Sequence, residues 1–184
     1  MSNYRRRSAD YPASLFQDAL YMREALQVNP NRVVAMQFSQ THRMNSIGTS
    51  NLNGGLVVLM VSDWAAVLAH IPPLPYPTRD PRAGLNNVRN RMDDFVDEYY
   101  RYYQSLPHSH SRTYIVVPLY QGRMALPSHR DTAVDELNRN GLPQPRIVYY
   151  EVRRGGGGHP ASGSVFIDAR DRRRPDVYVE DRRI

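Results

Sequence analysis

The chain of 184 residues is long enough for one domain, carries a net charge of +6, and has 41% hydrophobic residues, which excludes global disorder. It has no cysteine and all 24 basic residues are arginine, which excludes disulfides, thiolate metal sites, cysteine nucleophiles, lysine Schiff bases and lysine-dependent phosphate loops. Because no apolar run approaches the roughly 20 residues that span a bilayer, and none follows the basic N-terminus, we expect a soluble, intracellular protein without a membrane partner.

The first part of the chain predicts a basic arm, a helix and a strand. We expect residues 1–10 to form a flexible arm ahead of a single domain over 11–184. Apolar residues at helical spacing predict an amphipathic helix over 13–27, and a strand is predicted at 32–38. The polar stretch 39–53, rich in Ser, Thr, Asn and Gly, predicts a loop.

Two apolar runs of strand length then flank a short polar turn. Leu56–Val61 and Ala65–Ile71 contain almost no polar residue, which predicts a buried β-hairpin. His70 lies at the end of the second run. It is a candidate for a catalytic base, for a pocket residue that binds without chemistry, or for an ordinary packed histidine.

The second part of the chain alternates helices and strands. A proline-rich connection over 71–83 leads to the longest predicted helix, 84–106. A second helix is predicted at 129–140, with Ser128 as its N-cap. Strands are predicted at 113–120, 146–152, 164–168 and 176–179, with a glycine-rich turn before the last two. This order predicts a mixed β-sheet packed with helices, in the α/β or α+β class.

The hairpin and the elements after it follow a known pattern. Gly54-Gly55 opens the first strand, Ala69-His70-Ile71-Pro72 ends the second, and Asn140-Gly141-Leu142-Pro143 ends the short helix. These motifs resemble the CheD family of bacterial chemoreceptor glutamine deamidases over roughly residues 32–180. The resemblance implies a CheD-like layered sandwich, in which the segment 71–112 is an expansion.

One departure from the family decides what the resemblance implies about activity. The family nucleophile is a cysteine at the start of the first strand, where this chain has Gly55 or Leu56. Thr49 is the nearest candidate for the family's orienting threonine, and His70 matches its histidine. Neither glycine nor leucine can attack a carboxamide, so the resemblance implies a CheD-like fold that has lost the family reaction.

Other side chains are candidates for binding. Four tyrosines, Tyr99, Tyr100, Tyr102 and Tyr103, wrap around the long helix, so some point away from its apolar face, as in protein-binding surfaces. Arg153 and Arg154 border the glycine-rich turn and are candidates for contact with an anion. No histidine spacing matches a metal motif, and we expect neither a metal nor a cofactor.

Three functions are consistent with these patterns. The leading hypothesis is a non-catalytic, CheD-like binding or scaffold module whose partner is another protein or a second copy. The first alternative is an amidohydrolase in which Thr49, Ser50 or Ser46 replaces the cysteine and His70 acts as the base. The second is a nucleic-acid-binding protein that uses its arginine clusters. The absence of lysine is interpreted as codon bias, as selection against ubiquitination, or as a preference for bidentate anion recognition.

Overall fold

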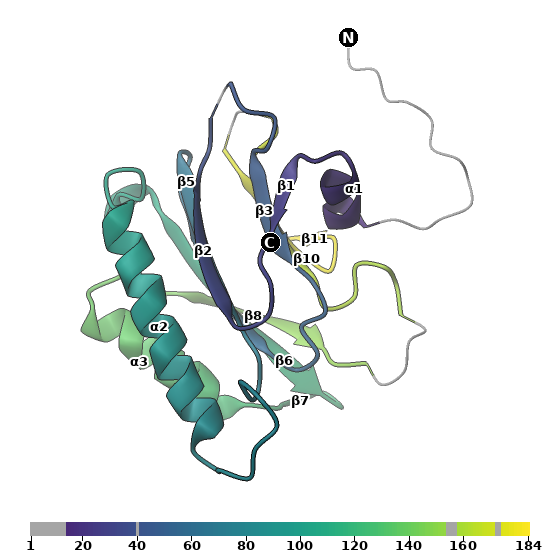
Figure 1. The fold of residues 1–184 in the computed structure, drawn as a ribbon, viewed down its shortest axis with the longest axis vertical. Helices are drawn as coiled ribbons and strands as arrows, with labels where there is room; N and C mark the ends of the chain where they lie inside the picture. Colours follow the sequence, from purple (N-terminus) through teal and green to yellow (C-terminus); the bar gives the residue numbers. More distant parts are fainter. Residues whose placement is uncertain (1–13, 40, 154–157, 172–173) are drawn as a thin grey trace.

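Two β-sheets pack face to face in the computed structural model, which describes residues 14–39, 41–153, 158–171 and 174–184 (Figure 1). The central sheet has six strands and the outer sheet has five. Helices α2 and α3 cover the free face of the central sheet, and α1 lies on the opposite side of the molecule, against the outer sheet (Figure 1). The described chain is therefore a mixed α/β protein, as the sequence predicts.

The central sheet contains the predicted hairpin. Its strands are β2 (Arg32–Gln37), β5 (Ala65–Ile71), β4 (Leu56–Val61), β6 (Arg112–Tyr120), β7 (Arg123–Met124) and β8 (Arg146–Glu151). The order is β2-β5-β4-β6, after which both β7 and β8 pair with β6. All pairs are antiparallel except β6 with β8. Among the described strands, nothing pairs with the outer side of β2 or of β8.

The outer sheet joins the beginning of the chain to its end. Its strands, in spatial order, are β1 (Ala25–Gln27), β3 (Ser46–Thr49), β9 (Val165–Asp168), β10 (Asp176–Val179) and β11 (Arg182–Arg183). Helix α1 (Leu15–Tyr21) packs on this sheet through Phe16, because Gly48 has no Cβ that would collide with the phenyl ring.

The hairpin β4–β5 is buried on both faces, which explains its unbroken apolar sequence. Val58 and Met60 face α2 (Ala83–Arg101) and α3 (Pro127–Arg139), whereas Val57 and Leu59 face the outer sheet. Every residue of β4 and β5 is buried. Alternate residues of a strand point to opposite faces, so each strand contributes to two separate cores.

Three local predictions are wrong. The helix predicted over 13–27 ends at Tyr21, because Arg23 takes a positive φ of 56° and residues 25–27 form β1. The predicted loop 39–53 contains β3, whose four buried residues include two polar side chains that the periodicity could not identify as buried. Helix α3 begins earlier than predicted: its N-cap is Leu126 and Pro127 opens it, so Ser128 is not the cap.

The helix predicted over 84–106 is shorter in the structure: α2 begins at Ala83 and ends at Arg101, so Tyr102 and Tyr103 follow it in a turn. A single turn of 3-10 helix, η1 (His108–His110), follows α2. The arm predicted at 1–10 lies outside the described residues. In the described part of the chain, no helix combines the length and the hydropathy that a transmembrane helix requires.

Candidate functional site

His70 lies between the two sheets. Its side chain points to the same face of β5 as those of Ala66 and Leu68, which belong to the core between the central and the outer sheet. Thr49 approaches from the opposite side, because it shares the inward face of β3 with Ile47. The pairing of β3 with β9 and of β5 with β4 fixes the two backbones that carry this histidine and this threonine.

The two side chains form a buried hydrogen-bonded pair. The distance between Thr49 Oγ1 and His70 Nδ1 is 2.7 Å, and Thr49 Oγ1 also donates to the carbonyl oxygen of Val28 at 2.8 Å. A threonine hydroxyl has one hydrogen, so if that hydrogen goes to Val28, His70 must donate from Nδ1 to the hydroxyl oxygen. The network therefore assigns the neutral Nδ1–H tautomer to His70.

This arrangement is opposite to that of an activated nucleophile. A general base accepts the proton of the hydroxyl that attacks. Here the Thr49 proton is directed to Val28, and His70 is a donor to Thr49 rather than an acceptor from it. The pair satisfies polar groups in the core, where an unpaired group is costly.

Burial holds the imidazole in its neutral form. His70 is 1% exposed and Thr49 is 0% exposed. Removal of the ring from water lowers the pKa of His70 to about 4. The pair therefore carries no charge at neutral pH.

The turn that precedes β4 is closed around Gly55, one of the two positions at which the suggested resemblance would place a nucleophile. A Cβ built on Gly55 would lie 2.8 Å from the carbonyl oxygen of Ile71 and 3.0 Å from that of Leu52. Tyr150 fixes the same turn from β8: its hydroxyl accepts from Gly54 N at 3.0 Å and donates to Gly55 O at 2.9 Å. A cysteine at Gly55 would therefore need the surrounding backbone to move.

The other candidate nucleophiles do not reach His70. Ser46 lies at the far end of β3, where its hydroxyl donates to Asp168 at 3.3 Å. Ser50 follows β3 and is half-buried, and its hydroxyl makes no hydrogen bond to the imidazole. Of the three candidates, the structure brings only Thr49 to the histidine.

Two contacts at this site were absent from the sequence analysis. Val28 contributes a backbone carbonyl, which no side-chain pattern can indicate. Tyr150 was predicted to lie on a strand, but its contact with the turn depends on the parallel pairing of β8 with β6, which the sequence did not reveal. The only signal was the pair of tyrosines, Tyr149 and Tyr150, in the middle of the predicted strand.

The four candidate tyrosines, two in the last turn of α2 and two just after it, divide into two pairs. Tyr99 and Tyr102 pack against the core beneath the helix, whereas Tyr100 and Tyr103 are 55% and 54% exposed. The rings of Tyr99 and Tyr100 meet edge to face, with centroids 5.2 Å apart. Two of the four are thus available to a partner.

The arginine candidates differ in whether a carboxylate already binds them. Arg170 is bound by two carboxylates: its guanidinium lies 2.6 Å from Asp168 and 3.1 Å from Glu24. Arg153 is exposed, and Arg154, Arg172 and Arg173 lie outside the described residues. Among the described residues, no group of three His, Asp or Glu side chains is placed to hold a metal ion. Arg170 therefore supports the outer sheet and is not free for a nucleic-acid phosphate.

Comparisons with known proteins do not assign this arrangement to a family. No family model matches the sequence, and a search among curated proteins finds no relative.

Loss of the Thr49 hydroxyl should destabilise the fold. We expect Thr49→Val to lower the free energy of unfolding by about 1–3 kcal/mol, because His70 Nδ1–H and the Val28 carbonyl both lose their partner in the core. Thr49→Ser, which keeps the hydroxyl, should lose clearly less. Urea unfolding followed by circular dichroism measures both. Equal losses for valine and serine would contradict the assigned role of the hydroxyl.

The lowered pKa of His70 predicts a loss of stability in acid. Above the ordinary value of 6.5 the ring is neutral in both the folded and the unfolded chain. As the pH falls from 6.5 towards 4, the unfolded chain binds a proton that the folded chain excludes, which removes about 3 kcal/mol of stability by pH 4. The difference in unfolding free energy between wild type and His70→Asn should therefore shrink over this range. A difference that stays constant from pH 7 to pH 4 would refute the shift.

Introducing a cysteine at Gly55 should not create an active site. We expect Gly55→Cys and Gly55→Ala to be destabilised by similar amounts, about 1–3 kcal/mol, because both add the Cβ that meets the Ile71 carbonyl. Unfolding midpoints in urea provide the comparison, and ammonia release from glutamine-containing peptides tests activity. A stable, active Gly55→Cys protein would contradict the closed geometry of this turn.

Proposed function

We propose that the chain is a non-catalytic, CheD-like module that associates with a second copy of itself through the free edge of β2. The observation that carries the proposal is this unpaired, apolar edge strand. The inverted direction of the Thr49–His70 hydrogen bond and the space missing at Gly55 weigh against the amidohydrolase alternative. The ion pairs of Arg170 weigh against the nucleic-acid alternative.

The edge of β2 presents open backbone groups. Just beyond the two strands, the N–H of Phe38 donates to the carbonyl oxygen of Trp64. This hydrogen bond continues the register of β2 with β5, in which Arg32 lies opposite His70. Backbone groups alternate in direction along an antiparallel strand, so those of Val33, Ala35 and Gln37 face away from β5. On that side, the described part of the chain supplies no strand.

This edge lacks the features with which proteins prevent edge-to-edge pairing. Its interior residues, Val33 to Met36, are all apolar and half-buried. The register with β5 is continuous, so no bulge twists the strand, and no proline or interior charge interrupts it. Such an edge is a template for another strand.

A second copy fits the edge in sequence and in charge. In an antiparallel pair centred on Ala35, Val34 would face Met36 of the other copy and Val33 would face Gln37, so that all outward backbone groups are matched. The shallow groove beside the start of β2 is lined by three arginines and three carboxylates, Arg32, Arg91, Arg101, Asp94, Asp97 and Glu98. This surface is electrically balanced, whereas the whole chain carries +6 and repels its copy elsewhere.

Exposed aromatic side chains flank the edge. Helix α2 packs on β2; Tyr100 in its last turn and Tyr103 just beyond its end are both exposed. Trp64, whose carbonyl closes the end of β2, is 50% exposed and contacts His110 edge to face. Tyrosine and tryptophan are enriched in protein interfaces, so these rings are suited to extend the strand contact.

Blocking the outward N–H of β2 should produce a monomer. Ala35→Pro removes one edge donor and leaves the hydrogen bonds to β5, because the backbone of Ala35 faces the open side. We expect it to raise the dimer dissociation constant at least tenfold in sedimentation equilibrium. Ala35→Lys should do the same by placing like charges opposite each other.

Tyr149→Pro is the matched control, because it makes the same change on the edge of β8 and should leave the dimer intact. Since the β2 surface is balanced in charge, raising the salt concentration should not dissociate the dimer. A wild-type protein that stays monomeric at a concentration on the order of 100 µM would refute the proposal.

A further inference from the structure

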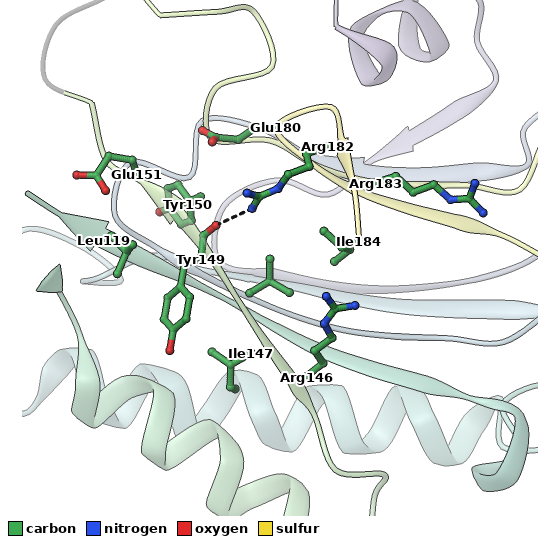
Figure 2. Close-up of a pocket in the computed structure, with 11 residues that line it drawn as sticks. Leu119, Arg146, Ile147, Tyr149, Tyr150, Glu151, Glu180, Arg182, Arg183 and Ile184 are labelled. Atoms are coloured by element: carbon green, nitrogen blue, oxygen red, sulfur yellow. Dashed lines mark hydrogen bonds between the residues drawn. The ribbon is translucent and has the colours of Figure 1, made fainter. Parts of the chain in front are cut away.

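A groove runs along the other free edge of the central sheet. It has a volume of about 630 Å³ and lies between β8 and the C-terminal hairpin β10–β11 of the outer sheet. Figure 2 shows Arg146 at one end, Arg182 above the middle of β8, and Glu151 with Glu180 at the other end. Val148 and Ile184 give the groove an apolar floor.

The edge of β8 has its own open backbone groups. Val152 N donates to Leu119 O on the β6 side, whereas Tyr149 O faces the groove, where it accepts from Arg182 at 3.3 Å (Figure 2). The N–H and C=O groups of successive residues in a strand point to opposite sides. Those of Ile147, Tyr149 and Glu151 therefore point into the groove. Apart from the Arg182 contact, the described residues provide no partner for this edge.

The groove is lined by three arginines and two glutamates, and two of these arginines lack a carboxylate partner among the described residues. Glu151 accepts from Gly122 N and Glu180 accepts from Gly163 N, so both carboxylates are already bound by backbone N–H groups. Arg183 is paired with Asp176 at 2.6 Å. Among the described residues, no carboxylate pairs with Arg146 or Arg182, and both side chains are exposed.

We propose that this groove binds an extended acidic segment of another protein, which pairs as an added strand with β8 while its carboxylates bind Arg146 and Arg182. An incoming N–H would replace Arg182 on the Tyr149 carbonyl. The guanidinium released in this way is then free to bind a carboxylate of the segment in two-point geometry.

The positions of the arginines specify the pattern of the segment. The guanidinium groups of Arg146 and Arg182 both lie on the side of the outer sheet (Figure 2), so the carboxylates that bind them must project from one face of the added strand. Side chains on one face of a strand recur at every second residue. The segment should therefore carry acidic residues at alternate positions, with neutral residues between them.

A peptide fits this groove better than a nucleic acid. Single-stranded nucleic acids are held by aromatic rings on which the bases stack, beside the cationic groups. Figure 2 shows the ring of Tyr149 directed towards the helices and away from Arg182. Tyr150 is buried and bound to the turn at Gly54 and Gly55, so the arginines have no adjacent stacking surface.

The test uses fluorescence anisotropy with a labelled peptide of about eight residues, the length of a strand. Its glutamates alternate with threonine and valine, and a second peptide of the same composition has its glutamates in one block. We expect the alternating peptide to bind at least tenfold more tightly. Arg182→Glu and Arg146→Glu should each weaken binding at least tenfold. Arg89→Glu makes the same charge change on the exposed face of α2 and should have little effect.

Backbone pairing is tested separately from charge. Tyr149→Pro, or N-methylation of alternate peptide residues, should remove binding, whereas Ala35→Pro should not. Hydrogen exchange should slow at the amide of Tyr149 when the peptide is bound and stay unchanged at the amide of Ala35. These measurements also separate this groove from the proposed dimer edge, because each proline variant should affect only one of the two interactions.

Three results would overturn the proposal. The first is equal binding of the alternating and blocked peptides. The second is binding that does not depend on Arg182. The third is binding of inorganic phosphate or a short oligothymidine with the same arginine dependence and no change in the Tyr149 amide, which would make the groove a general anion site.

Discussion

The fold depends on the burial of the β4–β5 hairpin on both faces, because the helices need one of these faces and the outer sheet needs the other. Any polar group near this hairpin must find its partner inside the protein. That requirement accounts for the shared hydroxyl between Val28 and His70, and for the two hydrogen bonds by which Tyr150 closes the turn at Gly54 and Gly55. The most suggestive histidine in the sequence is therefore part of the internal support that joins the two sheets.

The two free edges of the central sheet differ in chemistry, which is why we propose different partners for them. The edge of β2 is apolar and borders equal numbers of arginines and carboxylates, so a chain with a net charge of +6 can approach its own copy there. The edge of β8 borders arginines that have no carboxylate partner in the described part of the chain, which favours an acidic segment. A protein with both properties could form a dimer and hold one acidic ligand on each copy. The CheD-like, non-catalytic character proposed for the chain is compatible with this role, since neither edge involves Thr49 or His70.

The sequence predicted the class of the fold and the elements with strong periodicity. The hairpin was identified because both of its strands are apolar throughout, and α2 because its apolar residues follow a regular helical spacing. Strand β3 was missed because Ser46 and Thr49 are polar, and their burial follows only from pairing with the distant strand β9. The candidate pair of Thr49 and His70 was named, but the direction of its hydrogen bond depends on a backbone carbonyl. The groove at β8 was not predicted, because it forms between strands whose pairing no local pattern reveals.

The outer sheet has a consequence for the order in which the chain folds during synthesis. Strands β1 and β3 leave the ribosome early, yet β3 must wait for β9 to complete its hydrogen bonds, and α1 packs on Phe166 of that same strand. Even the first turn of α1 is bound by a late residue, since Leu15 N donates to the carboxylate of Asp181. Closing a loop of this length is slow compared with forming local contacts. The central sheet, apart from β8, is complete in sequence well before the outer sheet can assemble, so the nascent chain exposes the apolar face of β4–β5 until its last strands arrive. Premature termination shortly before β9 would leave that face uncovered, and such fragments would be prone to aggregate.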